Sequence, residues 1–514
     1  MTAETFTATV ALIGIVILVA SLLSGVVERT GVPQVAIFLI LGAALGPFGL
    51  GVFDLALESP ALRTLSTLGL VLVLFSDAIS LDLAEIRRNV RLALLVLGPG
   101  SLIPAALIAL SAWYLLDLHW AASAIVGASL ASTDPVLLRG LLRRPDVPAT
   151  ARLALRLESG MNDVVLLPIV VVSMMVLHSA TGGPPEEHRS AARVALGLLV
   201  LGPGAGVVAG LVGITLLDRV RKSVGVRRDY ESLYALGVAF TAFAAAEAAG
   251  GSGFLAAFAA GITVAALDVE LCDCFLDYGE ATAEMFLLLT FVAFGGSLIW
   301  RGLEVLNVRT IAFASIALGV RTVVLFPVLA RAGVDRASRR FVAWFGPRGL
   351  STLLLALLPV FDGIAGAEQL FVLCCLVVLL SVLIHGSAIV VLVRWRRNNS
   401  TSTHAIMPGA SVAPPRATGN LAPLDHKPAL PSEPTPVSAA EDTGDVPERI
   451  TLDELRELHA AGEQVVLLDV RTQRTFESDP FIASGAIRMP PDDAVRLATS
   501  HRIPWKATLV AYCA

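Results

Sequence analysis

The feature of this sequence that most constrains its fold is a series of long apolar segments without charged residues. Each runs for about 17 to 25 residues, the length that a helix needs to cross the hydrocarbon core of a bilayer. Of the 514 residues, 55% are hydrophobic and only 16% are charged, whereas soluble domains carry about a quarter charged residues. The sequence therefore predicts an all-α polytopic membrane protein rather than an ordinary soluble enzyme.

Thirteen membrane spans are predicted where charged or Pro/Gly-rich segments separate the apolar ones. Arginine and lysine are about four times as frequent in one set of alternate loops as in the other, and this bias marks the cytosolic side. We therefore expect a protein of the cytoplasmic membrane with its N-terminus outside and its C-terminus in the cytosol. The predicted spans are residues 8–27, 32–46, 61–80, 91–114, 120–140, 153–178, 192–217, 231–249, 252–267, 284–300, 307–330, 341–360 and 368–393.

The C-terminal part of the chain has a different composition. The transmembrane domain is predicted to occupy residues 1–397. Residues 398–447 are rich in Pro, Ser, Thr and Ala, cannot bury enough apolar surface to fold, and are expected to form a flexible linker. In residues 448–514, an amphipathic helix and a short apolar strand indicate a second, water-soluble α/β module.

Charge and cysteine content exclude several function classes. The net charge of −5 leaves no basic field for a phosphate backbone, so no nucleic-acid partner is expected. No GxxxxGK[ST] loop is present, and neither ATP hydrolysis nor a cofactor is expected. The cysteines show no spacing typical of a disulfide framework, and Cys272 and Cys274 are interpreted as free thiols rather than as metal ligands.

Two of the predicted spans are interrupted. In the fifth, Thr133-Asp134-Pro135 combines a proline that opens the helix backbone with a carboxylate beside the freed carbonyls, which is typical of ion sites in transporters. A plain kink would need Pro135 but not Asp134, so we favour an ion site. Gly346-Pro347 interrupts the twelfth span, and the paired interruptions predict two broken crossing helices within inverted repeats.

The sixth span places four polar residues, Glu158, Ser159, Asn162 and Asp163, largely on one side of a helix. Asp163 then opens a long run without another charge. A carboxylate in such surroundings can accept a proton or a small cation, but not both. The alternative, a carboxylate paired only for structure, is less favoured because no basic residue lies one turn further along the apolar run.

Further ionisable residues lie in or at apolar spans. Arg321 and Arg348 each require a carboxylate if buried, and Glu158 is the expected partner. Asp77 follows Ser76 at the end of the third span. It could line a cavity or simply mark the end of the helix, and the residues alone leave both readings open.

Taken together, these motifs resemble the NhaP-type sodium/proton antiporters of the first monovalent cation:proton antiporter family. The resemblance covers about residues 5–396 and depends on the order of TDP at 133–135, ESGMND at 158–163, GFLAAFAAG at 253–261 and GPRGL at 346–350. It implies that Asp163 is the carboxylate that exchanges the cation and the proton, with Asn162 as its partner in an Asn-Asp pair. It also implies electroneutral exchange and a homodimer.

The same resemblance implies further roles. Thr133, Asp134 and Ser159 would complete the oxygen shell of Na⁺ or K⁺ at Asp163, and Glu158 would form a buried ion pair with Arg348. Many relatives carry a glutamate directly after the phenylalanine of the third span, where this chain has Ser76 and then Asp77. Asp77 is therefore a candidate cation ligand, and the choice among sodium, potassium and lithium stays open.

Residues 449–514 resemble a rhodanese-like domain. The matching pieces are LLDVRT at 467–472, Gly485-Ala486-Ile487 and the strand LVAYC that ends at Cys513. In that family the cysteine after this strand is a persulfide-carrying nucleophile, cradled by the loop that follows. The sequence stops at Ala514, so the tail is expected to be an incomplete domain without sulfurtransferase activity.

The sequence thus predicts a secondary antiporter, not an enzyme, that exchanges protons for Na⁺ by alternating access in a lipid bilayer. K⁺/H⁺ exchange is the first alternative. A membrane-anchored sulfurtransferase is less favoured because thirteen spans with internal carboxylates exceed what anchoring requires. A channel would need a continuous pore and would not couple cation flux strictly to protons.

Overall fold

The structure is a computed structural model that divides into two compact units, Met1–Ser411 and Val412–Ala514. The predicted domain borders near residues 397 and 447 stay predictions. The described residues are 14–22, 33–81, 83–134, 147–180, 191–224, 226, 228–267, 280–403, 455, 458, 465–470, 482–483, 485–489 and 507–512.

The described part of the first unit is mostly helical. Residues 14–22 form a helix, and short π-helical and 3₁₀ segments, labelled η, interrupt the later helices. The remaining elements are α2 (Gln34–Leu45), α3 (Pro60–Ile79), α4 (Leu83–Arg88), α5 (Val90–Leu97), α6 (Pro99–Leu116), α7 (Trp120–Ala131), α9 (Ala149–Ala180), α10 (Ala191–Leu196), η1 (Gly197–Leu201), α11 (Gly202–Ser223), α12 (Arg228–Ala248), α13 (Gly253–Leu267), α15 (Glu280–Ala293), η3 (Phe294–Leu298), η4 (Ile299–Leu303), α16 (Val308–Arg331), α17 (Arg336–Trp344), α18 (Leu350–Phe361) and α19 (Ala367–Thr403).

Seven helical segments of the described chain are long and apolar enough to cross a membrane, and α2, α7, α13 and α18 are shorter apolar helices. Large apolar side chains stay exposed on α11 and α16, including Val208, Val212 and Val323. Such exposure is unfavourable in water and is expected where a helix faces lipid. These features fit a multi-pass membrane protein, while the count of thirteen spans and the inverted repeats stay predictions.

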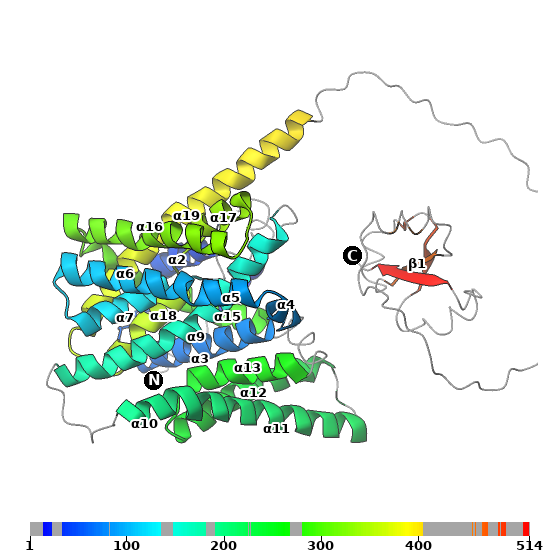
Figure 1. Cartoon of the computed structure of the whole chain (residues 1–514), viewed down its shortest axis with the longest axis horizontal. Helices are drawn as coiled ribbons and strands as arrows, with labels where there is room; N and C mark the ends of the chain where they lie inside the picture. The colour runs from blue at the N-terminus through cyan, green and yellow to red at the C-terminus, as the bar shows by residue number, and fades with distance from the viewer. Residues whose placement is uncertain are drawn as a thin grey trace, which may run out of the picture. The chain divides into compact units, whose positions relative to one another are not determined.

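Helices α10 to α13 gather along one side of the first unit (Figure 1). The close approach of α11 to α13 depends on Gly206, because a Cβ at this position would collide with the backbone of Ala256. Small residues permit such backbone contact between membrane helices. Helix α13 also packs against α3, which connects this group of helices to the rest of the unit.

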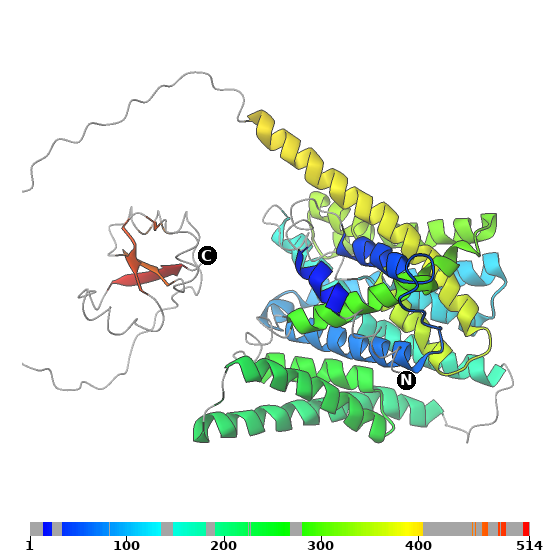
Figure 2. The ribbon, with the colours of Figure 1, turned by 180° about the vertical axis from the view of Figure 1, so that it is seen from behind.

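Helix α9 occupies a central position, packed against α3, α5, α6, α7, α17 and α18. Polar side chains in the middle of α9 therefore face several helices instead of lipid. On the other side of the unit (Figure 2), α2 lies against α15 and η3. Gly42 and Gly295 allow this contact, because a Cβ on either would overlap the backbone of the other helix.

Helix α19 extends further than the sequence predicted. It continues through residues 398–403 to Thr403, beyond the predicted end of the thirteenth span at residue 393. Once the long apolar part of the helix has formed, each added residue gains a hydrogen bond without a new nucleation step. This cooperativity explains why the helix continues into a polar sequence that would not start one.

The second unit contains a three-stranded parallel sheet in the order β2-β1-β3. Its strands are β1 (Val465–Asp469), β2 (Ile487–Arg488) and β3 (Thr508–Tyr512). They lie where the sequence predicted strands and a return. Cys513 and most of the predicted amphipathic helix lie outside the described residues, so the rhodanese-like assignment stays a prediction.

Candidate functional site

Two non-helical segments meet in the first unit, one after α7 and one between α17 and α18. Helix α7 ends at Ala131 and residues 132–134 are non-helical, while α17 and α18 are separated by the non-helical residues 345–349. The interruptions are joined by a backbone hydrogen bond of 3.0 Å from Asp134 N to Pro347 O. Proline disfavours helical geometry at the residue before it, and Pro135 follows Asp134. The helical geometry thus ends at both positions where the sequence predicted an interruption, while residues 135–146 lie outside the described residues.

Charged side chains satisfy the open ends of these helices. Asp134 Oδ2 accepts a 2.7 Å hydrogen bond from Leu350 N at the start of α18. Arg348 Nη1 donates to Ala131 O and Ser132 O, at 3.1 and 3.2 Å, at the end of α7. Helix N-termini carry partial positive charge and C-termini partial negative charge, so each side chain has the sign that stabilises its helix end.

Two glycines in the GPRGL motif make room for these charges. A Cβ on Gly349 would overlap the carboxylate of Asp134, and a Cβ on Gly346 would overlap the guanidinium of Arg321. A larger residue at either position would displace a buried charged group or the backbone beside it. The motif therefore supplies the capping arginine and the space around two ionised side chains.

Asp163 lies in the middle of α9 and is only 3% exposed. Ser132 Oγ, from the interruption after α7, donates a hydrogen bond to Asp163 Oδ1. Ser351, in the first turn of α18, also interacts with this carboxylate, and Asp134 is close enough for its charge to act on it. Both interrupted helices thus contribute polar groups to one buried carboxylate.

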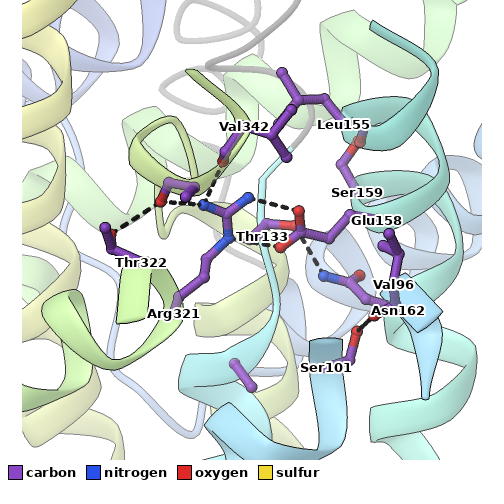
Figure 3. Close-up of polar contacts among 12 residues, drawn as sticks. Val96, Ser101, Thr133, Leu155, Glu158, Ser159, Asn162, Arg321, Thr322 and Val342 are labelled. Carbon is purple, nitrogen blue, oxygen red and sulfur yellow. Dashed lines mark hydrogen bonds and ion pairs between the residues drawn. The ribbon is translucent and has the colours of Figure 1, made fainter. Parts of the chain in front are cut away.

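Asn162 precedes Asp163 and is completely buried. Its Nδ2 donates a 2.9 Å hydrogen bond to Thr133 Oγ1, as Figure 3 shows. Within the described part of the chain, Asn162 Oδ1 has no hydrogen-bond partner. An amide oxygen with free lone pairs beside a carboxylate is a suitable ligand for a hard cation, which binds through oxygen. The hydrogen bond to Thr133 Oγ1 fixes the orientation of the amide, so its position does not depend on a bound ion.

Glu158 is paired with Arg321 and not with Arg348. Arg321 Nε and Nη2 donate to Glu158 Oε1 and Oε2 at 2.6 and 2.5 Å, in the two-bond geometry seen in Figure 3. Arg321 Nη1 also donates to the carbonyls of Val342 and Ala343 at the end of α17. The pairing of Glu158 with Arg348 implied by the resemblance is therefore wrong, because Arg348 is held by the end of α7.

Ser159 and Asp77 are the two other cation ligands that the sequence predicted. Ser159 Oγ donates to Leu155 O of its own helix at 2.8 Å, which leaves its oxygen able to accept or ligate. Asp77 is half-buried near the end of α3 and lies beside Gly160 of α9. The structure thus brings Thr133, Asp134, Asn162 and Asp163 together directly, and places Asp77 on the neighbouring helix.

Sequence reasoning missed three hydroxyl residues at this site. Ser132, Ser351 and Thr352 are buried, and Thr352 Oγ1 donates to Ser132 O at 3.4 Å. The sequence did contain a signal for them, because each of these residues lies next to one of the two motifs that predicted an interruption. Two interrupted helices that cross bring the residues next to both interruptions together, so their flanking hydroxyls belong with the carboxylate.

Comparison with known proteins agrees with this arrangement. The family model described as the transmembrane sodium/hydrogen exchanger matches residues 14–395. The chain belongs to this family. A K(+)/H(+) antiporter NhaP2 from Shewanella sp. (strain MR-4) is 26% identical over 377 residues, which cover 72% of this chain and 64% of the Shewanella protein. The chain therefore matches less than two thirds of the length of that relative.

Two further proteins extend the comparison. The K(+)/H(+) antiporter NhaP of Alkalimonas amylolytica is 24% identical over 398 residues, covering 76% of this chain and 67% of that protein. The solved structure of the sodium proton antiporter MjNhaP1 from Methanocaldococcus jannaschii at pH 8 has a TM-score of 0.60 and 19% identity, covering 76% of this chain and 98% of that one. The latter similarity supports the fold of the membrane unit.

Proposed function

We propose that this sodium/hydrogen exchanger family member is a secondary antiporter that exchanges protons for a monovalent cation at Asp163. The proposal depends chiefly on a buried carboxylate that receives a hydrogen bond from an interrupted helix and lies next to an amide oxygen without a partner. Asp163 would bind the cation or the proton in turn. Movement of one group of helices against another would expose it alternately to each side.

The charges around Asp163 favour electroneutral exchange. Arg321 is neutralised by Glu158, and Asp134 and Arg348 cap helix ends. One exchanging carboxylate holds one proton or one monovalent cation, and each carries a single positive charge. The loaded site therefore has the same net charge in both halves of the cycle.

The cation is Na⁺ or K⁺. Sodium is the cation expected from the sequence, and K⁺ is the second candidate because the Shewanella and Alkalimonas relatives are named K(+)/H(+) antiporters. Ser159 and Asp77 are further proposed ligands, since each places an oxygen near the same stretch of α9. Either residue would add an oxygen ligand to those that Asp163, Asn162 and Thr133 provide for the cation.

Proton flux in inverted membrane vesicles tests this proposal directly. A pH-sensitive dye reports the release of a preformed proton gradient when Na⁺, K⁺ or Li⁺ is added. We expect cation-dependent release by the wild-type protein and none by Asp163→Asn, which keeps the shape of the side chain but cannot exchange a proton. Asp117→Asn is a matched control, because Asp117 is an exposed carboxylate paired with Arg309 and asparagine tolerates its left-handed backbone.

Release by Asp163→Asn equal to that of the wild type would contradict the proposal. So would release that continues without a coupled cation, as a proton channel would show.

Three further parts of the proposal need their own measurements. We propose that the N-terminus is outside and the C-terminal tail cytosolic in the cytoplasmic membrane, which cysteine accessibility in intact cells can test. Cross-linking in membranes tests the proposed homodimer. Thiosulfate:cyanide sulfurtransferase activity, compared with Cys513→Ser, tests the expectation that the tail is inactive.

A further inference from the structure

The helix that begins with α15 changes its geometry twice before it ends. It is α-helical over Glu280–Ala293, π-helical over Phe294–Leu298 (η3) and 3₁₀-helical over Ile299–Leu303 (η4). Trp300 Nε1 donates a 2.7 Å hydrogen bond to Gly295 O, so a side chain of η4 satisfies a carbonyl of η3. Short π-helical and 3₁₀ segments inside a helix often mark functional sites and hinges.

The first part of this helix is held against α2. A Cβ on Gly295 would overlap the backbone of Leu39, and a Cβ on Gly46 would overlap the backbone of Gly296. Helix α15 also packs against α3, and α3 packs against α13. Helices whose backbones are in contact cannot move against each other without losing dense packing. Helices α2, α3, α13 and α15 with η3 thus form one group, which we call the supporting group.

The second part of the helix is held against α19. A Cβ on Gly302 of η4 would overlap the backbone of Cys375 and Leu376. Beside this contact, Arg301 Nη2 lies 3.2 Å from Glu368 Oε2 in the first turn of α19. The segment η4 is therefore joined to α19 by a backbone contact and an ion pair.

Helix α19 is tied to the proposed exchange site. Its Ser381 Oγ accepts a 2.7 Å hydrogen bond from Arg348 N, in the interruption before α18. It also packs against α7 and α18, the helices next to which Ser132 and Ser351 interact with Asp163. Helices α7, α9, α18 and α19 with η4 thus form a second group, which we call the exchange group.

Side chains make several contacts between the two groups. The ring centroids of Phe294, in η3, and Phe371, in α19, are 6.0 Å apart. The ring of Pro33, directly before α2, lies beside Gly386 of α19. Packed helices can slide past each other by small adjustments of such side chains.

The contact between α3 and the end of α18 also depends on a side chain. Arg63 Nη1 donates a 3.3 Å hydrogen bond to Phe361 O, and the guanidinium lies 5.8 Å from the centroid of the Phe361 ring. Arg63 is exposed. Because water can replace the hydrogen bond of an exposed donor, this contact can open at little cost.

We propose that η3 and η4 form a hinge between the supporting group and the exchange group. Hinges are a few positions at the ends of elements that absorb a change of backbone angles. Within residues 294–303 the chain passes from a segment held by α2 to one held by α19. In each cycle η4 stays on α19, while Arg63 separates from Phe361 and binds it again. This inference rests on the proposed exchange at Asp163 and states which contacts the movement breaks.

Cross-linking of cysteine pairs in the full chain tests the inference. The five native cysteines are first replaced by alanine. The pair Arg63→Cys with Phe361→Cys joins the two groups, whereas Arg301→Cys with Glu368→Cys joins η4 to α19. The two pairs are matched in position, because Phe361 and Glu368 lie on either side of the turn between α18 and α19. A short bifunctional methanethiosulfonate bridges each pair, and a reductant removes it.

The readout is cation self-exchange in proteoliposomes, with each variant compared before bridging, after bridging and after reduction. The bridge between residues 63 and 361 should slow exchange at least about tenfold and reversibly, because the two groups can no longer separate. The bridge between residues 301 and 368 should change the rate less than about twofold, because η4 and α19 move together.

The pair Asp117→Cys with Arg309→Cys controls for the reagent. It bridges an exposed contact between α6 and α16, two helices that pack against each other, and it should leave the rate unchanged. A bridge between residues 301 and 368 that stops exchange would overturn the inference. So would a bridge between residues 63 and 361 that does not slow it.

Distances between spin labels provide a readout that does not depend on flux. Leu50 follows α2, Leu303 ends η4, and Tyr114 lies near the end of α6, which packs against α7; all three side chains are exposed. Labels at 303 and 114 should keep one distance with and without saturating cation. Labels at 50 and 114 should show two.

A single distance for the pair at 50 and 114, or two distances for the pair at 303 and 114, would overturn the inference even if transport is absent. If the pair at 50 and 114 shows two distances but the wild-type protein carries no cation flux, the proposed function fails and the hinge does not.

Discussion

Removing the charge of Glu158 should strongly destabilise the membrane unit. Its carboxylate and the Arg321 guanidinium are both almost completely buried, at 4% and 3% side-chain exposure. Glu158→Gln keeps the size of the side chain and one acceptor, but it leaves a buried cation without a counter-charge. Breaking such a pair costs about 3–5 kcal/mol. We expect about 3 kcal/mol, because Arg321 Nη1 keeps its bonds to two backbone carbonyls of α17.

The measurement is the free energy of unfolding of the purified protein in mixed detergent micelles at neutral pH. The double variant Glu158→Gln with Arg321→Met removes both charges and should be more stable than Glu158→Gln alone. As a control, Glu368→Gln breaks an exposed pair with Arg301 and should cost less than about 1 kcal/mol. A loss below about 1 kcal/mol for Glu158→Gln, or a double variant less stable than that single variant, would refute the reasoning.

Two further variants probe the ends of the interrupted helices. Gly349→Ala should abolish cation-dependent proton flux, because its Cβ would displace the Asp134 carboxylate, whereas Gly319→Ala faces open space and should retain flux. Hydrogen bonds from Ser338 hold the pKa of Asp335, the N-cap of α17, below its ordinary value of 3.8. The ionised cap therefore stabilises α17 above that pH, and this stabilisation is lost as the pH falls further. Asp335→Ala should therefore speed amide exchange in the first turn of α17 at neutral pH and have a smaller effect at about pH 3. Equal effects of Asp335→Ala at both pH values would contradict this assignment.

The interruptions and their carboxylates could be predicted from the sequence because the relevant effects are local. Proline after Asp134 and at position 347 limits the backbone within a residue or two, whatever the surrounding fold. Asp163 is likewise identified by the uncharged run that it opens. Such features need no knowledge of which helices are neighbours.

The pairing of the arginines could not be predicted in the same way. Glu158 had two candidate partners far away in sequence, Arg321 and Arg348, and the resemblance favoured the second. The carbonyls at the end of α7 accept hydrogen bonds from Arg348. Arg321 is therefore the arginine that pairs with Glu158. Counting those carbonyls as acceptors that need a donor would have identified the correct pair.

The length of α19 shows another limit of local reasoning. Residues 398–403 have a composition typical of a linker, yet they continue the helix to Thr403. Composition describes what a segment would do alone, whereas this segment extends a helix that already exists.

The central claim, that one carboxylate holds the proton and the cation alternately, is tested most directly by the pH dependence of the apparent KM for the cation. Proteoliposomes of the full chain permit this measurement from initial rates over a range of cation concentrations. If both ions compete for Asp163, the apparent KM for the cation should rise about tenfold for each unit by which the pH falls in the acidic range, because protons then occupy most sites. An apparent KM that does not change with pH, while cation-coupled proton flux persists, would contradict competition at a single carboxylate.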